Sequence, residues 1–149
     1  MIDPENALKK WALDTMKANA ALVALVPAER ILSYLPEGSA LPQSPYIVLG
    51  PWTATGEDAA CFEGMLVNMV INAYTVPGGP NGGDAGEHGS GALTGRISAA
   101  IRRALKTDDA GLPDDATAAI SHRVTRHFPL NGGICMSSVN MEATFDQFE

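Results

Sequence analysis

The longest β-hairpin that the sequence predicts lies near its end, in "TAAISHRVTRHFPLNGGICMSSVNMEATFDQF", residues 117–148. Strands are expected at 117–128 and 134–148, and "PLNGG" between them holds Asn131 and Gly132, which suit a tight reversal. In the second strand, apolar residues alternate with polar ones, as in a strand with one buried face. The apolar set is Cys135, Val139, Met141, Ala143 and Phe145, and the polar set is Ser138, Asn140, Glu142 and Thr144. The hairpin therefore predicts a sheet that is dry on one face.

Two more strands and a helix are predicted upstream. Pro45–Gly50 is expected as a buried strand, and Phe62–Val76 as a longer strand whose alternation leaves one dry face. Apolar residues at helical spacing then predict a helix to about Lys106. The stripe consists of Leu93, Ile97, Ala100, Ile101 and Ala104. The following "TDDAGLPDD", 107–115, is expected to end that helix and turn the chain.

The amino-terminal region predicts helices. Asp3 and Pro4 form a helix start, and apolar residues at helical spacing continue to about Lys17. Asn19 is expected to cap a short second helix that Pro27 ends. The proline-rich segment before the first buried strand is expected to be extended or edge-like. The chain is thus expected to be one α+β domain, 1–149, in which two main helices pack on one face of an antiparallel or mixed sheet of about four strands.

Composition excludes some function classes. Hydrophobic residues make up 46% of the chain and charged ones 18%, which is typical of a globular protein, and the net charge of −7 opposes binding to nucleic acid or an anionic membrane. The start "MIDPEN" lacks the basic residues of a secretory signal, so a soluble protein kept in the cytoplasm is expected. In that compartment Cys61 and Cys135 are expected as two buried thiols in strands.

A glycine-rich segment, "PGGPNGGDAGEHGSG" at 77–91, separates a predicted strand from a predicted helix, as in nucleotide-binding loops. It lacks the lysine of a phosphate-binding loop and the spacing of a dinucleotide fingerprint, and Asp84 and Glu87 would repel phosphate. A metal site built from Asp84, Glu87 and His88 would have to order a very flexible backbone. We therefore expect no cofactor, no metal and a mobile loop at 78–91. A small-ligand or nucleotide-binding module that uses this loop is the alternative from another functional class.

The sequence shows no catalytic constellation. Both cysteines lie within apolar alternation without a nearby basic partner, and Ser90 has no acid and base beside it arranged as a triad. His122 and His127 are five residues apart on a predicted strand, so they are expected on opposite faces and unable to share a metal. The chain is therefore not expected to be an enzyme.

Several positions are candidates for contacts with other protein subunits. Arg123 and Arg126 lie on a predicted strand with two partly polar faces, which suits a subunit interface. Tyr46 and Trp52 are candidate aromatic anchors near a strand end. The same interface is expected to include four residues of the glycine-rich segment: Asn81, Asp84, Glu87 and His88.

The late predicted helix carries a basic cluster with two interpretations. The cluster consists of Arg96, Arg102, Arg103 and Lys106. It could be a phosphate-contact patch. Alternatively, its last three members complement the negative end of the helix dipole beside Asp108 and Asp109. The second interpretation is favoured.

The segment "ANAALVALVPAERILSYLPEGSALPQSPYIVLG" (18–50), with its capped short helix and proline-bracketed strand, resembles the tail-completion or tail-terminator proteins of long-tailed bacteriophages, prophages and gene transfer agents. The likeness continues in "LTGRISAAIRRALKT" (93–107) and in "HRVTRHFPLNGGICMSSVNMEATF" (122–145), so it covers nearly the whole chain. The connection at 77–91 is longer and richer in glycine than the family's usual one. No family contact is therefore carried over to it.

This resemblance implies a structural virion protein: a small α+β subunit that forms a ring, usually a hexamer, and that can stay monomeric in isolation. Such a ring caps the tail tube at its head-proximal end, stops tube polymerisation and docks the head or neck. Its partners would be further copies of itself, the tail tube protein and a neck or head-completion protein. DNA would pass through the channel only as cargo, which acidic subunits would repel.

The implied location is the bacterial cytoplasm during assembly and then the head-proximal end of the virion tail, with no membrane partner. A neck or head-closure adaptor, one ring higher in the particle, is the alternative within assembly.

Overall fold

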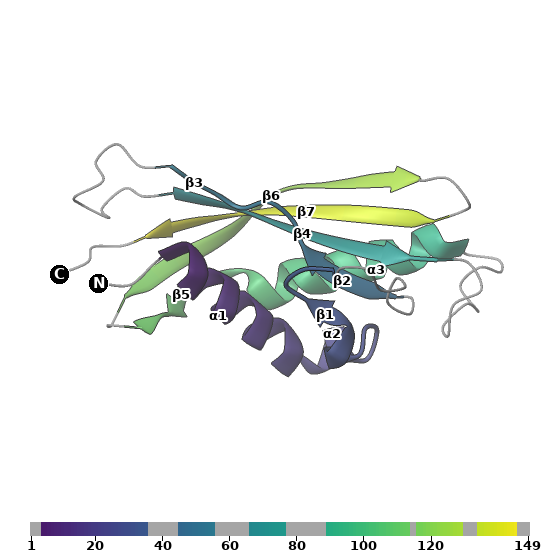
Figure 1. Ribbon diagram of the computed structural model, residues 1–149, viewed down its shortest axis with the longest axis horizontal. Coiled ribbons are helices and arrows are strands. Elements are labelled where there is room, and N and C mark those ends of the chain that lie inside the picture. The colour runs from purple at the N-terminus through teal and green to yellow at the C-terminus, as the bar shows by residue number, and fades with distance from the viewer. Residues whose placement is uncertain are drawn as a thin grey trace.

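The computed structural model describes residues 4–35, 45–55, 66–76, 89–113, 116–129 and 134–145. These residues form three α-helices, one short 3-10 helix and seven strands (Figure 1). The elements are α1 (Pro4–Ala18), α2 (Ala20–Val23), η1 (Ala28–Arg30), β1 (Ile31–Leu32), β2 (Tyr46–Leu49), β3 (Thr53–Thr55), β4 (Leu66–Thr75), α3 (Gly89–Leu105), β5 (Thr107–Gly111), β6 (Thr117–Pro129) and β7 (Cys135–Phe145).

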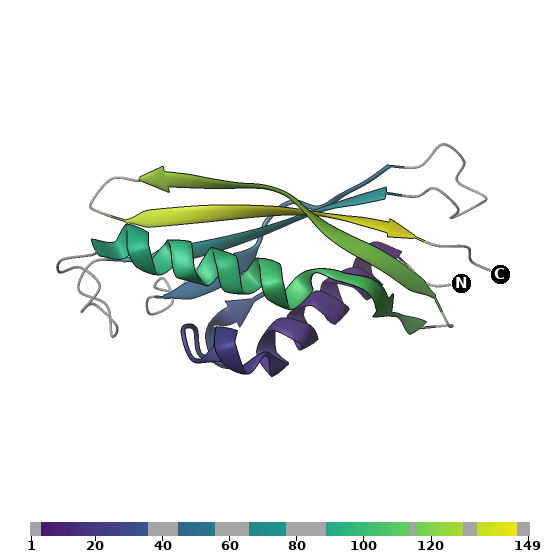
Figure 2. The same cartoon turned by 180° about the vertical axis from the view of Figure 1, so that it is seen from behind.

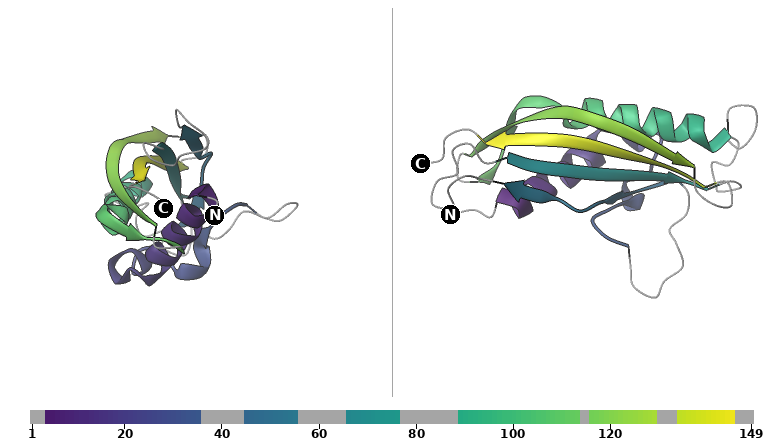
Figure 3. Two further views of the ribbon diagram at one scale, coloured as in Figure 1. Left: turned by 90° about the vertical axis from the view of Figure 1, so that its left-hand side faces the viewer. Right: turned by 90° about the horizontal axis from the view of Figure 1, so that it is seen from above.

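All seven strands belong to one sheet in the order β1-β2-β4-β7-β6-β5, with β3 also paired to β4. Every pairing is antiparallel except that of β1 with β2. The three α-helices lie on one face of the sheet, and the sheet curls around them (Figures 1 and 3). The opposite face, which we call the open face, is not covered by any of these helices (Figure 3).

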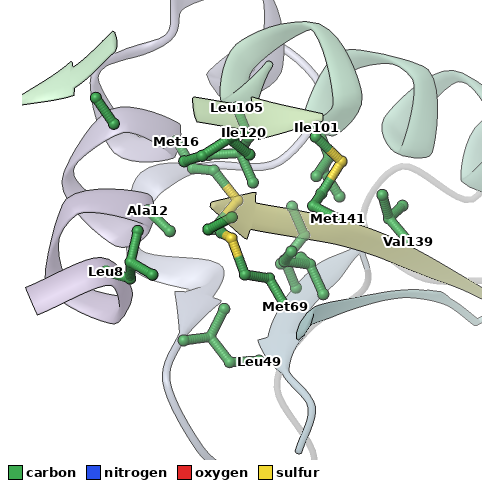
Figure 4. Packing of buried hydrophobic residues seen from close by; sticks show 14 of the residues in the cluster. Leu8, Ala12, Met16, Leu49, Met69, Ile101, Leu105, Ile120, Val139 and Met141 are labelled. Atoms are coloured by element: carbon green, nitrogen blue, oxygen red, sulfur yellow. The ribbon is translucent and has the colours of Figure 1, made fainter. Parts of the chain in front are cut away.

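The core lies between the helices and the inner face of the sheet (Figure 4). Leu8, Ala12 and Met16 of α1 point toward Met69 of β4 and Met141 of β7, and all five side chains are fully buried. Helix α3 packs on β4, β6 and β7 through the predicted apolar stripe, in which Leu93, Ile97, Ala100 and Ile101 are buried and Ala104 is partly buried. The dry faces predicted for the two long strands are confirmed: Val67, Met69, Ile71, Ala73, Val139, Met141, Ala143 and Phe145 are all buried.

The predicted helix starts are also confirmed. Helix α1 begins at Pro4, and the side chain of Asn19 caps α2 by accepting a hydrogen bond from the backbone N–H of Leu22 at 3.0 Å. Helix α3 begins at Gly89, inside the glycine-rich segment, so residues 89–91 are helical. The rest of the predicted mobile loop lies outside the described residues.

The expected sheet of about four strands was too small, because three short strands were not counted. One of them, β1, does lie at the sheet edge, in the segment expected to be extended or edge-like. Strands β1 and β3 have two and three residues, too few to show a period. Strand β5 occupies residues predicted as a turn, and it forms because Thr107, Ala110 and Gly111 pair with β6 despite the poor strand propensity of "TDDAG". Cys135 is half-buried rather than buried, and Cys61 lies outside the described residues.

A β-bulge in β6 overturns the prediction that His122 and His127 lie on opposite faces. His122 pairs with Met141 of β7, but Val124 pairs with the next residue, Asn140, so Arg123 is an extra residue in the ladder. The extra residue reverses the alternation. His122 and His127 consequently share the helix-facing side of β6.

A bend separates β2 from β3. The backbone N–H of Gly50 and the indole N–H of Trp52 both donate to the carbonyl oxygen of Val70 in β4, at 2.7 Å and 3.0 Å. A Cβ atom on Gly50 would lie 2.7 Å from Cγ1 of Val70, closer than a side chain tolerates. Glycine thus allows the chain to pass against β4 and turn Trp52 into the core.

Candidate functional site: the open face of the sheet

Side chains on the open face form rows that cross the strands. The first row consists of Tyr46, Tyr74, Met136 and Phe128, which are in register across β2, β4, β7 and β6. Tyr46 and Tyr74 are stacked, with ring centroids 5.0 Å apart and planes inclined by 16°. Burial raises the pKa of both phenols, so both are uncharged at neutral pH. At the β6 end of the row, the Phe128 side chain is 40% exposed.

The next row consists of Val48, Asn72, Ser138 and Arg126. Val48 and Ser138 are buried, whereas Arg126 is exposed. The Oδ1 atom of Asn72 is buried without a hydrogen-bond partner in the described structure, which is uncommon for a polar atom in a sheet. The open face is therefore sheltered at β2 and reaches solvent at β6.

One accessible part of the open face is a stripe on β6, formed by Val124, Arg126 and Phe128, which we call the β6 stripe. These residues follow the bulge at every second position and so point the same way. Val124 is 38% exposed, so two apolar side chains border one guanidinium. Next to the stripe, Nε of Arg123 lies 3.4 Å from Oε2 of Glu142 on β7. This combination of apolar contact area with Arg side chains is typical of protein interfaces.

The structure brings together some of the residues predicted for an interface. Tyr46, Arg123 and Arg126 all lie on the open face. Trp52 instead belongs to the core, where only 8% of it is exposed and Nζ of Lys9 lies 5.9 Å from its ring centroid. The other four, Asn81, Asp84, Glu87 and His88, lie outside the described residues. The interface role of all eight stays a prediction.

A polar set that the sequence did not indicate lies on the other side of β6. Nε2 of His122 lies 2.8 Å from Oγ1 of Thr125, and Nδ1 of His127 lies 2.7 Å from Oγ of Ser137. Burial, and secondarily the charge of Arg102 on α3, lower the pKa of His122. No sequence pattern marks the bulge that turns these imidazoles toward α3. The only signal for this set in the sequence was the pair Arg102 and Arg103 on α3.

The family model of the tail completion protein gp17 matches residues 13–145. The chain belongs to this tail completion family. The resemblance based on 18–50, 93–107 and 122–145 is thereby confirmed. Comparison with curated proteins gave no match.

A solved structure shows the same fold as this tail completion protein. A chain from the virion of a native gene transfer agent particle superposes with a TM-score of 0.72 at 20% sequence identity, and the match covers 95% of this chain and 96% of that chain. Among the described residues of the tail completion protein, no three His, Cys, Asp or Glu side chains lie close enough together to hold a metal ion. Within the same ranges, no helix has the length and apolar character needed to cross a membrane.

Proposed function

We propose that this tail completion protein is a tail terminator. In this role, copies of the chain form a ring, expected to be a hexamer, at the head-proximal end of the tail tube. The ring stops tube polymerisation and offers a docking surface to the head or neck, while DNA passes through it. The observation that carries the proposal is the family match over residues 13–145.

The open face supports an assembly role rather than a chemical one. A ring of identical subunits closes through two unlike patches on each subunit. The β6 stripe offers one such patch, because Phe128 and Val124 expose apolar area beside Arg126. We assign the stripe to a contact with a neighbouring copy, the tube protein or a neck protein, and place Arg123 at its rim. The stacked pair Tyr46 and Tyr74 would support the stripe from within the sheet.

The first experiment deletes the gene for this protein from the genome that carries it. Without a terminator, tube growth has no stop at its upper end, so electron micrographs should show tails of abnormal length and heads without tails. Tails of normal length in the deletion would contradict the proposal. If headless tails purified from a head-deficient strain lack the protein, it is instead a neck or head-closure adaptor.

Complementation of the deletion tests the β6 stripe. Phe128→Ser removes an exposed aromatic ring, and we expect it to restore normal tails about tenfold less efficiently than the wild-type gene does, because interface aromatics are frequent anchors. Tyr34→Ser is the matched control, since Tyr34 is 73% exposed and lies after β1, away from the stripe. If both variants rescue the deletion equally, and circular dichroism shows that both proteins are folded, the stripe is not part of the interface.

A further inference from the structure

A groove runs between α3 and β6, on the side of β6 opposite the stripe. It consists of two hollows of about 470 Å³ and 200 Å³, which share Arg102. Arg102, Arg103, Lys106, Ser121 and His122 line the larger hollow. Gly95, Ser98, Ala99, Arg102, Thr125 and His127 line the smaller one. Helix α3 and strand β6 run in opposite directions along the groove, and the right-hand view of Figure 3 shows them side by side, while Figure 2 shows the same region from behind.

The β6 wall of the groove is a free sheet edge. Strand β5 pairs with β6 only from Thr117 to Ile120, and no other described strand lies on that side. From Ser121 to Pro129, β6 is therefore paired with β7 alone. An unpaired edge presents alternating backbone N–H and C=O groups, which an extended polypeptide can satisfy by adding a strand.

The α3 wall of the groove is basic. Arg102, Arg103 and Lys106 are exposed, and within the described ranges none of them forms an ion pair. The chain as a whole carries −7, so this concentration of positive charge is unlike the rest of its composition. His122 adds an imidazole to the same hollow. Such a cluster attracts carboxylates or phosphates.

From the free edge and this charge, we infer that the α3–β6 groove binds an extended acidic segment of a partner protein. The segment would pair with β6 along residues 121–129 and place its carboxylates against Arg102, Arg103 and Lys106. The edge favours a polypeptide over DNA, because phosphates accept hydrogen bonds but cannot donate to the carbonyl groups of β6. The inference does not depend on the terminator role.

The dimensions of the two walls agree. From Ser121 to His127 a strand extends about 20 Å, and from Gly95 to Lys106 a helix rises about 16 Å. A segment of about nine residues can pair with the free edge at 121–129, and its side chains beside Ser121 and His122 reach the basic residues. On β6 itself, the bulge, Arg123 and Pro129 hinder unselective strand pairing, as in other protected edges.

A model peptide tests the groove on the intact chain. The probe is a blocked peptide of about eight alternating Glu and Thr residues, long enough to follow the free edge. At millimolar peptide, we expect shifts in the backbone amide NMR signals of residues 121–129 and slower hydrogen exchange there. Two variant peptides separate the contributions: methylation of alternate backbone nitrogens removes strand pairing at the same charge, and Lys in place of Glu reverses the charge. Both should bind at least about tenfold more weakly.

The protein variants follow the same logic. The double variant Arg102→Gln/Arg103→Gln should weaken binding about tenfold or more, because two charge-assisted contacts are lost. Lys17→Gln is the matched control, since Lys17 is the basic residue in the last turn of α1, as these arginines are in α3, and lies outside the groove. Absence of peptide-induced shifts would overturn the inference. So would equal binding of the methylated peptide, or tighter binding of a duplex DNA probe at the same residues.

Discussion

At Gly50, two atoms of Val70 determine how closely the chain can pass β4. The backbone N–H of Gly50 is 2.7 Å from the carbonyl oxygen of Val70, and the space for a Cβ is taken by Cγ1 of the same valine. We expect Gly50→Ala to lower the free energy of unfolding by about 1–3 kcal/mol, because β4 must shift or lose this hydrogen bond. Urea unfolding followed by circular dichroism would measure the change.

Gly95→Ala is the control for Gly50→Ala, and its effect should have the opposite sign. Gly95 lies within α3, and a Cβ there would meet no atom within 4 Å. Alanine should therefore raise the free energy of unfolding by about 0.5–1 kcal/mol through helix propensity. If both alanines destabilise the protein equally, close packing at Gly50 is not the cause.

His122 gives the chain a pH-dependent stability. Its pKa in the folded protein lies below the ordinary value of 6.5, first because of burial and second because of Arg102. As pH falls below 6.5, the unfolded chain takes up the proton before the folded chain does, so the free energy of unfolding decreases. Other positive charges beside His122 in the groove are Arg103 and Lys106.

Arg102→Gln should raise the pKa of His122 without restoring it fully, because burial remains. An NMR titration of the imidazole protons measures this, and Lys17→Gln should leave the pKa unchanged. In unfolding experiments below pH 6.5, the Arg102→Gln variant should lose less stability than the wild type. An unchanged pKa in Arg102→Gln would show that Arg102 does not act on His122.

At the scale of elements, helices and strands with a periodic sequence could be predicted, whereas short strands that form only by pairing with a neighbour could not. Strands β4 and β7 and helix α3 bury the faces that their apolar spacing predicts. The same spacing that defines each element also selects its core residues. Strand β5 has no such pattern, and its acidic "TDDAG" is held in the sheet by β6. The bulge at Arg123 depends on the register between two strands, which a single segment does not encode.

The strands should also differ in how readily they open. Strand β4 is paired on both sides, to β2 or β3 and to β7, and its inner residues are fully buried. We expect its backbone amides to exchange with deuterium most slowly. Amides of residues 121–129 in β6, paired on one side, should exchange faster. Exchange measured by NMR or mass spectrometry checks this order, and equal protection of the two strands would contradict it.

At the scale of the whole molecule, β6 separates two surfaces of different chemistry. The open face presents the apolar and aromatic β6 stripe, and the groove presents basic residues and imidazoles. The sequence supplied Arg126, Tyr46 and the basic cluster of α3 as candidates, but not their division between two surfaces. That division depends on the fold, because neighbouring residues of β6, such as Arg126 and His127, face different surfaces.

The extra residue at Arg123 also has a consequence for how this protein can change by insertion and deletion. Without Arg123, His122 and Val124 would be consecutive residues and would pair with Met141 and Asn140 in a regular ladder, as they pair now. Val124, Arg126 and Phe128 would then stay on the open face, and Thr125 and His127 would stay on the side that faces α3. Loss of one residue beyond the bulge, by contrast, would turn the later part of β6 over and exchange the chemistry of the two surfaces, whereas loss of the bulge residue leaves both surfaces unchanged.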